Sequence, residues 1–190
     1  SHTPKEKSRM QTQIAQAGQK FRDLLAGPIL GVLPEKTKET LLLRGFGFLK
    51  IPMLFFISPS VVELNDEKCV VKVPLNRRTK NHLRSMYFGV LAAGADCAGG
   101  LIAMRLIQTE AKGKVSLVFK DFHADFLKRA EGDVFFTCTQ GEAIQELVRK
   151  TMASGERENL PVEVIATVPS KLGNEPIARF TLTLSLKSRA

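Results

Sequence analysis

The segment MYFGVLAAGADCAGGLIAM, residues 86–104, decides the fold of this chain. Asp96 is its one charged residue, and the segment has the length of a membrane-crossing helix. A carboxylate in the middle of such a helix costs roughly 2.5–3.5 kcal/mol on insertion scales, so we interpret the segment as a buried helix and expect no membrane span. A helix that is apolar on every side has to be enclosed on every side. This predicts a sheet that curls around it.

Segments on both sides of this helix show the alternation of apolar and polar residues that is typical of strands. Alternation predicts strands at residues 60–64, 67–73, 115–126, 134–138, 162–168 and 180–186. Within residues 115–126 the alternation changes parity, which predicts a β-bulge near Lys120 or Asp121. Short turns between the strands favour antiparallel pairing over β-α-β units. The expected class is therefore α+β, with a curved antiparallel sheet around a central apolar helix.

Helices are expected outside this sheet. Helical spacing of apolar residues predicts an amphipathic helix from about Thr3 to Leu25 and a short one at Glu142–Met152. A second N-terminal helix has Pro34 in its first turn and is expected to end at the glycines at 45 and 47. We therefore expect a helical extension over residues 1–50 and the sheet domain over residues 51–190. The central helix is expected to end near Met104, because turn-forming residues follow it.

The net charge of +9 should attract anions, whether nucleic acid, acidic lipid or a phosphorylated cofactor. Net charge alone favours none of these, so we expect no nucleic-acid binding. The densest basic cluster directly precedes the central helix and is either a solvated loop or an anion site. It consists of Arg77, Arg78, Lys80, His82 and Arg84.

Three cysteines, Cys69, Cys97 and Cys138, lie in apolar stretches without a C-x-x-C motif. They are expected to be buried free thiols in a reducing, cytoplasmic setting, and no apolar secretion signal is recognised near the N-terminus. The residues Asp121, His123 and Asp125 alternate on one strand and could bind a metal, but an outward polar face is the commoner explanation. We predict no metal site.

The run NHLRSMYFGVLAAGADCAG (residues 81–99) resembles the hotdog-fold thioesterases of the phenylacetate-degradation type. In that family a loop containing Asn leads into a His-Gly-Gly turn at the start of the central helix, and a catalytic acid follows one to two turns later. Gly89 matches the second glycine and Asp96 the acid, whereas Tyr87 replaces the histidine and Phe88 the first glycine. A closer resemblance is to an uncharacterised bacterial branch of the superfamily that has a Met-Tyr-Phe-Gly turn.

A second run, FLKRAEGDV (residues 126–134), resembles the strand-to-strand turn of the same family, and the whole resemblance extends roughly from Phe55 to Lys187. It implies a hotdog fold, a homodimer or dimer of dimers, and hydrolysis of an acyl-coenzyme A, in which coenzyme A is part of the substrate and no further cofactor is needed. A non-catalytic protein that binds acyl ligands or serves as a scaffold is the alternative. Hotdog hydratases usually add a histidine at the helix, and none lies in residues 86–104.

The resemblance also assigns roles. Asp96 would be general base or nucleophile, and the amides near Phe88 and Gly89 would polarise the thioester carbonyl, which a helix N-terminus favours. Asn81 would orient substrate or water. Burial in the apolar helix should raise the pKa of Asp96.

Further residues are expected to contact the substrate. Ser85 could instead be the N-cap of the helix, and His82 could simply face solvent, whereas the arginines could bind the phosphates of coenzyme A. The predicted substrate contacts are Tyr87, Ser85, His82, Arg77, Arg78 and Arg84.

Overall fold

The computed structural model describes residues 34–188, apart from the side chains of residues 46–50. The chain divides into two compact units, residues 1–56 and residues 57–190. The first unit contains helix α3 (Glu35–Lys50) and most of helix α4 (Pro52–Ile57). The amphipathic helix predicted from Thr3 to Leu25 lies outside the described residues.

Helix α3 is longer than predicted. It continues through the glycines at 45 and 47 and ends at Lys50, and one residue separates it from the next helix, which begins at Pro52. A glycine inside a helix is less favourable than alanine by about 1 kcal/mol, which is too little to end a helix by itself. Proline, by contrast, has no amide N–H and fits the first turn of a helix, so the boundary falls at Pro52.

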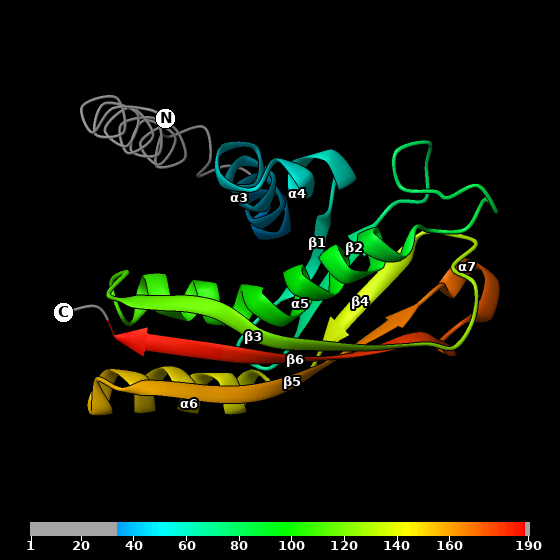
Figure 1. The fold of residues 1–190 in the computed structure, drawn as a ribbon. Helices are drawn as coiled ribbons and strands as arrows, with labels where there is room; N and C mark the ends of the chain where they lie inside the picture. Colours follow the sequence, from blue (N-terminus) through cyan, green and yellow to red (C-terminus); the bar gives the residue numbers. More distant parts are fainter. Residues whose placement is uncertain (1–33, 189–190) are drawn as a thin grey trace, which may run out of the picture. The chain divides into compact units, whose positions relative to one another are not determined.

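The second unit is a six-stranded antiparallel sheet wrapped around the long helix α5, as predicted (Figure 1). The strands lie in the order β1-β2-β4-β5-β6-β3. This is the hotdog fold expected from the sequence. Its elements are β1 (Ser60–Leu64), β2 (Cys69–Val73), α5 (Phe88–Thr109), β3 (Val115–Phe126), β4 (Val134–Cys138), α6 (Gly141–Ser154), β5 (Arg157–Thr167), α7 (Pro169–Leu172) and β6 (Pro176–Ser188).

Helix α5 is the core of this unit. By length and composition it could cross a membrane, but 72% of its most apolar window is buried inside the protein, which identifies it as a core helix. It extends to Thr109, beyond the predicted end at Met104. The extension occurs because Leu106 and Ile107 continue the buried face, while the Arg105 guanidinium pairs with the Asp66 carboxylate at the surface.

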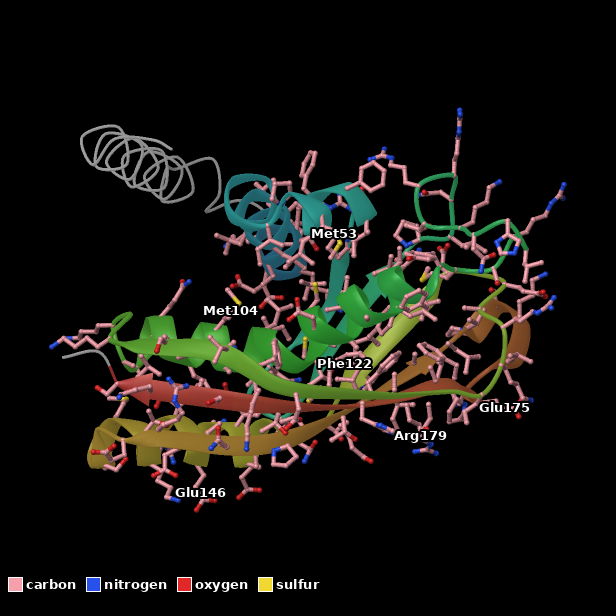
Figure 2. All side chains as sticks on the ribbon, viewed as in Figure 1. Met53, Met104, Phe122, Glu146, Glu175 and Arg179 are labelled. Carbon is pink, nitrogen blue, oxygen red and sulfur yellow. The ribbon has the colours of Figure 1, made fainter. Side chains whose placement is uncertain are left out.

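The predicted β-bulge is confirmed. In the pairing of β3 with β6, Phe119 opposes Leu184 and Phe122 opposes Leu182, so two residues of β3 face one residue of β6. The shift turns Phe122 toward the core side, where its ring lies 5.7 Å from that of Phe180 (Figure 2). Without it, the apolar residues of the second half of β3 would face outward.

The outer face of β3 carries the polar residues that alternate in the sequence. His123 Nε2 lies 3.4 Å from the Asp125 carboxylate, and both side chains are exposed. Among the residues that the structure describes, no three His, Cys, Asp or Glu side chains are grouped so that they could hold a metal ion. The three cysteines are buried and form no disulfide, as predicted, and burial raises the pKa of the Cys97 and Cys138 thiols.

Candidate functional site

Two loops determine where helix α5 begins. The amide of Tyr87 donates a hydrogen bond to the Thr79 carbonyl (2.8 Å), and the amide of Met86 donates one to the Ala130 carbonyl (2.8 Å). Tyr87, with extended backbone angles (φ −65°, ψ 137°), is the N-cap residue and provides no side-chain cap. The helix start is therefore held by backbone contacts with neighbouring loops.

The first amides of α5 remain available. Val90 and Leu91 donate to the Tyr87 carbonyl at 2.9 and 3.1 Å, whereas the amides of Phe88 and Gly89 have no acceptor within the described part of the chain. Free amides at a helix N-terminus bind negative charge. Two such amides can hydrogen-bond an oxygen that becomes negatively charged during a reaction.

Asp96 lies on the same side of α5 as Gly89. The two residues are seven positions apart, which is two helical turns or about 10 Å along the axis, and helical side chains tilt toward the N-terminus. Asp96 is half-buried, and burial raises the pKa of its carboxyl. Among residues 34–188, no side chain hydrogen-bonds or pairs with this carboxylate. A half-buried acid with a raised pKa and no partner is suited to accept a proton.

Asn81 and Ser85 hold the loop before α5 together. The Asn81 Oδ1 atom accepts hydrogen bonds from the amides of Leu83 (2.9 Å) and Ser85 (3.2 Å), and its Nδ2 donates to Ser85 Oγ at 3.2 Å. This is the local side-chain bonding that Asn prefers in turns. Ser85 as N-cap was a wrong prediction: Tyr87 takes that position, and the Ser85 hydroxyl is buried against Asn81.

The basic cluster belongs to an ordered loop. Thr79 is fully buried, and its Oγ1 donates to the Pro74 carbonyl (2.7 Å) and accepts from the Asn76 amide (2.8 Å). The charged residues around it are exposed, namely Arg77, Arg78, Lys80, His82 and Arg84. Figure 2 shows nitrogen-tipped side chains extending from this loop into solvent.

Two further cations lie in the loop after β3 and were not predicted to belong to the site. Lys128 and Arg129 are exposed and directly precede Ala130, whose carbonyl binds the Met86 amide. The residues 128 and 129 are about 45 positions from the first basic cluster, so only the folded chain brings them near. The sequence signal is the Lys-Arg pair in the FLKRAEGDV run, which the family resemblance assigns only to a turn.

A family match covers residues 39–185 and is to the domain of unknown function DUF4442. The chain belongs to the DUF4442 family. A search of the curated proteins found no match to it. The match begins within α3, and it includes α5 and most of β6 of this DUF4442 protein.

Solved structures share the fold of this DUF4442 protein. A protein of unknown function from Chlorobaculum tepidum has a TM-score of 0.68 at 13% identity, covering 81% of this chain and 97% of that one. A Pseudomonas aeruginosa protein described as a probable thioesterase has a TM-score of 0.64 at 22% identity (83% and 97% covered). A Haemophilus influenzae thioesterase has a TM-score of 0.56 at 15% identity (77% and 90% covered). These similarities establish the hotdog fold.

Proposed function

We propose that this protein is a thioesterase that hydrolyses an acyl-coenzyme A, with Asp96 as general base or nucleophile. The observation that carries the proposal is the position of Asp96, a half-buried carboxylate without a partner among the described residues, on the side of α5 where the free amide of Gly89 lies. Proteins with this fold include a thioesterase and a probable thioesterase. Function depends on the site and not on the fold, so the geometry of α5 has to provide the chemistry.

Thioester hydrolysis needs a nucleophile and a partner for the carbonyl oxygen. With Asp96 as base, a water oxygen attacks the carbonyl carbon while the carboxylate takes the water proton. The carbonyl oxygen becomes negative and accepts hydrogen bonds from the Phe88 and Gly89 amides. Cleavage of the C–S bond then releases the thiolate, which recovers the proton from Asp96. With Asp96 as nucleophile, its carboxylate oxygen attacks the carbonyl carbon, the C–S bond breaks and the thiolate leaves, which gives an acyl-aspartyl anhydride. Water then hydrolyses the anhydride to the free acid and the Asp96 carboxylate, and the proton released in this step is taken up by the thiolate.

The acyl carrier we propose is coenzyme A, because its phosphates match the charge of the surface beside the helix start. Two loops joined by the hydrogen bond from Met86 to Ala130 present Arg77, Arg84 and Arg129 to solvent. The neighbouring Lys128 is paired with the Glu175 carboxylate. Arginine forms charge-assisted, often bidentate, hydrogen bonds with phosphate. His82 is exposed in the same loop as Arg77 and Arg84 and would contact the rest of the carrier.

Replacing Arg77 and Arg84 together by alanine is expected to raise KM for an acyl-coenzyme A about tenfold with kcat nearly unchanged, since the lost contacts bind ground and transition states alike. Steady-state thiol release measures this. The same acyl group on N-acetylcysteamine carries no phosphate, and its KM should not change. Arg179→Ala removes an exposed cation from β6 and serves as the matched control. An equal rise in KM for both esters would contradict a phosphate contact.

We further propose that the protein forms a homodimer through strand β3, alone or within a dimer of dimers. β3 is last in the strand order, and among the described strands it pairs with β6 alone. An edge strand of 12 residues with exposed apolar side chains such as Val118 and Phe126 is a template for pairing with another chain. A second copy of the same strand would cover both edges symmetrically.

Val118→Lys is expected to raise the dissociation constant of the dimer at least about tenfold. The substitution removes an apolar contact, and two-fold symmetry places the two new lysine charges near each other where the β3 strands pair. Sedimentation velocity over a concentration series measures the change. Met152→Lys changes another exposed apolar residue, on α6, and is expected to leave the dimer intact. A wild-type protein that sediments as a monomer throughout would refute the dimer proposal.

The cytoplasm is the compartment we propose. The three cysteines, Cys69, Cys97 and Cys138, are buried and form no disulfide. Free thiols persist in reducing compartments, whereas oxidising ones favour disulfides.

A further inference from the structure

The ring of Tyr87 lies on the glycine that begins the candidate site. A β-carbon built on Gly89 would stand 2.7 Å from Tyr87 Cε1 and 3.3 Å from Cδ1. The ring thus fills the space in which any other residue at position 89 would have a side chain. The ring therefore covers the first turn of α5, and Asp96 follows two turns later on the same side of the helix.

Hydrogen bonds hold the backbone of Tyr87, whereas its side chain makes none within the described chain. Its amide binds the Thr79 carbonyl at 2.8 Å, and its own carbonyl accepts the amides of Val90 and Leu91. The side chain is 48% exposed, and within the described chain its hydroxyl has no hydrogen-bond partner. A change of its χ1 rotamer would therefore break no hydrogen bond of the helix start.

A neighbouring ring favours an apolar substrate at this position. The Phe88 ring lies 4.8 Å from that of Tyr87, tilted by 59°, and is itself 60% exposed. If the Tyr87 ring turned away, Gly89 and Phe88 would form an apolar surface beside the free amides. An acyl chain can replace the ring's contacts on that surface, whereas a polar group cannot.

We propose that Tyr87 is a specificity-determining gate: its ring covers Gly89 in the free protein and is displaced by the apolar acyl group of the thioester. This inference rests on the proposed thioesterase function and adds the element that selects among acyl groups. Larger acyl groups require a larger displacement of the ring. The gate therefore favours short acyl groups, and removing the ring opens the site to longer ones.

The position of the ring can be tested without any activity. The sequence has one tyrosine and no tryptophan, so Tyr87 alone gives the intrinsic fluorescence of the protein. In Gly89→Ala the added methyl group takes the place of the ring and pushes it into solvent. The quenching constant of the tyrosine fluorescence by acrylamide is therefore expected to rise. The rise is limited to about twofold, because Tyr87 is already 48% exposed.

Gly99→Ala is the matched control for this experiment. Its new methyl group would lie 3.4 Å from Val164 Cγ2, in ordinary contact. Gly99 is nearly three helical turns from Gly89, so tyrosine quenching should stay at the wild-type value. Alanine favours helix at both positions, so both variants should fold. Unchanged quenching in Gly89→Ala would overturn the placement of the ring over Gly89.

Selectivity is tested by kcat/KM for hexanoyl- and acetyl-coenzyme A. Tyr87→Ala is expected to raise the hexanoyl-to-acetyl ratio about tenfold, whereas Tyr87→Phe, which keeps the ring, should retain the wild-type ratio. A ratio that stays constant in Tyr87→Ala, with both esters affected equally, would reject the gate and leave Tyr87 a structural residue. If no protein releases thiol from any ester, the thioesterase proposal fails, and the quenching of Gly89→Ala still decides whether the ring covers the site.

Discussion

Asp96→Asn is expected to lower kcat for thiol release by about 10²–10⁴-fold, the usual contribution of a positioned general base. Asparagine keeps the shape of the side chain but cannot take a proton or attack a carbonyl. The assay is detection of free thiol from a panel of acyl-coenzyme A esters of increasing chain length. Glu163→Gln removes an exposed carboxylate on β5 and should retain wild-type activity. If the wild type exceeds Asp96→Asn on none of the esters, the protein is a binding or scaffold member of its fold.

The pH dependence of the same variant separates chemistry from folding. Burial raises the pKa of Asp96 in the folded protein, so the folded chain holds the proton at pH values where the unfolded chain has lost it. The wild type therefore loses stability as pH rises from the unfolded toward the folded pKa. Asparagine has no such loss, so Asp96→Asn should have a higher Tm than wild type at neutral pH and an equal Tm in acid below both values. A lower Tm at neutral pH would mean that the ionised carboxylate has a favourable contact in the folded protein.

Activity of the wild type should rise with pH through the same raised pKa, because only the ionised carboxylate can accept a proton. Stability and activity thus change in opposite directions over one pH range. We expect this opposite change if Asp96 is a functional carboxylate in an apolar helix. A purely structural acid would be expected to have a hydrogen-bonding partner that stabilises its charged form.

Features of the fold that depend on burial periodicity could be predicted from the sequence. The enclosed helix follows from the single charge in residues 86–104, and the bulge at residues 120–121 follows from the change of parity in β3. Both features follow from the pattern of apolar residues, which shows which side of a helix or strand faces the core. The ends of α3 and α5 were less predictable, because a glycine or a polar residue weakens a helix only slightly and packing decides whether it continues.

Features that depend on the path of a loop could not be predicted. Residue preference favoured Ser85 as N-cap, but the hydrogen bonds of Met86 and Tyr87 to other loops shift the helix start to Phe88. The approach of Lys128 and Arg129 to the first basic loop depends on the same long-range contact. The position of the Tyr87 ring on Gly89 could not be predicted from the sequence pattern either, because it depends on the rotamer of the Tyr87 side chain.

Gly94→Ala is expected to destabilise the protein by about 1–3 kcal/mol, the usual effect of overpacking a core. A β-carbon at position 94 would lie 2.3 Å from Cε2 and 2.4 Å from Cζ of Phe136. Phe136 is fully buried, and its ring packs 6.3 Å from that of Phe180, so it has little freedom to move. Urea unfolding followed by circular dichroism measures the free energy of unfolding.

Helix propensity determines how the change in the free energy of unfolding of Gly94→Ala is interpreted. Alanine is better than glycine in a helix by about 1 kcal/mol, so a substitution in α5 that meets no obstacle should stabilise the protein. Gly99→Ala, with its nearest neighbours at 3.4 and 3.5 Å on Val164 and Val162, is expected to be neutral or stabilising. The two variants differ only in what faces the new methyl group, so opposite signs would locate the closest approach of helix and sheet at Gly94.

A second substitution tests whether the Phe136 ring is the obstacle. Phe136→Leu alone leaves a cavity and should destabilise the protein, because the ring is fully buried. Combined with Gly94→Ala, the smaller side chain gives the methyl group room, so the double variant should lose clearly less stability than the sum of the single losses. Additive losses would mean that the methyl group disturbs something other than the ring. Close packing at this contact holds α5 against β4, and with it the spacing between the helix start and Asp96 on which the proposed chemistry depends.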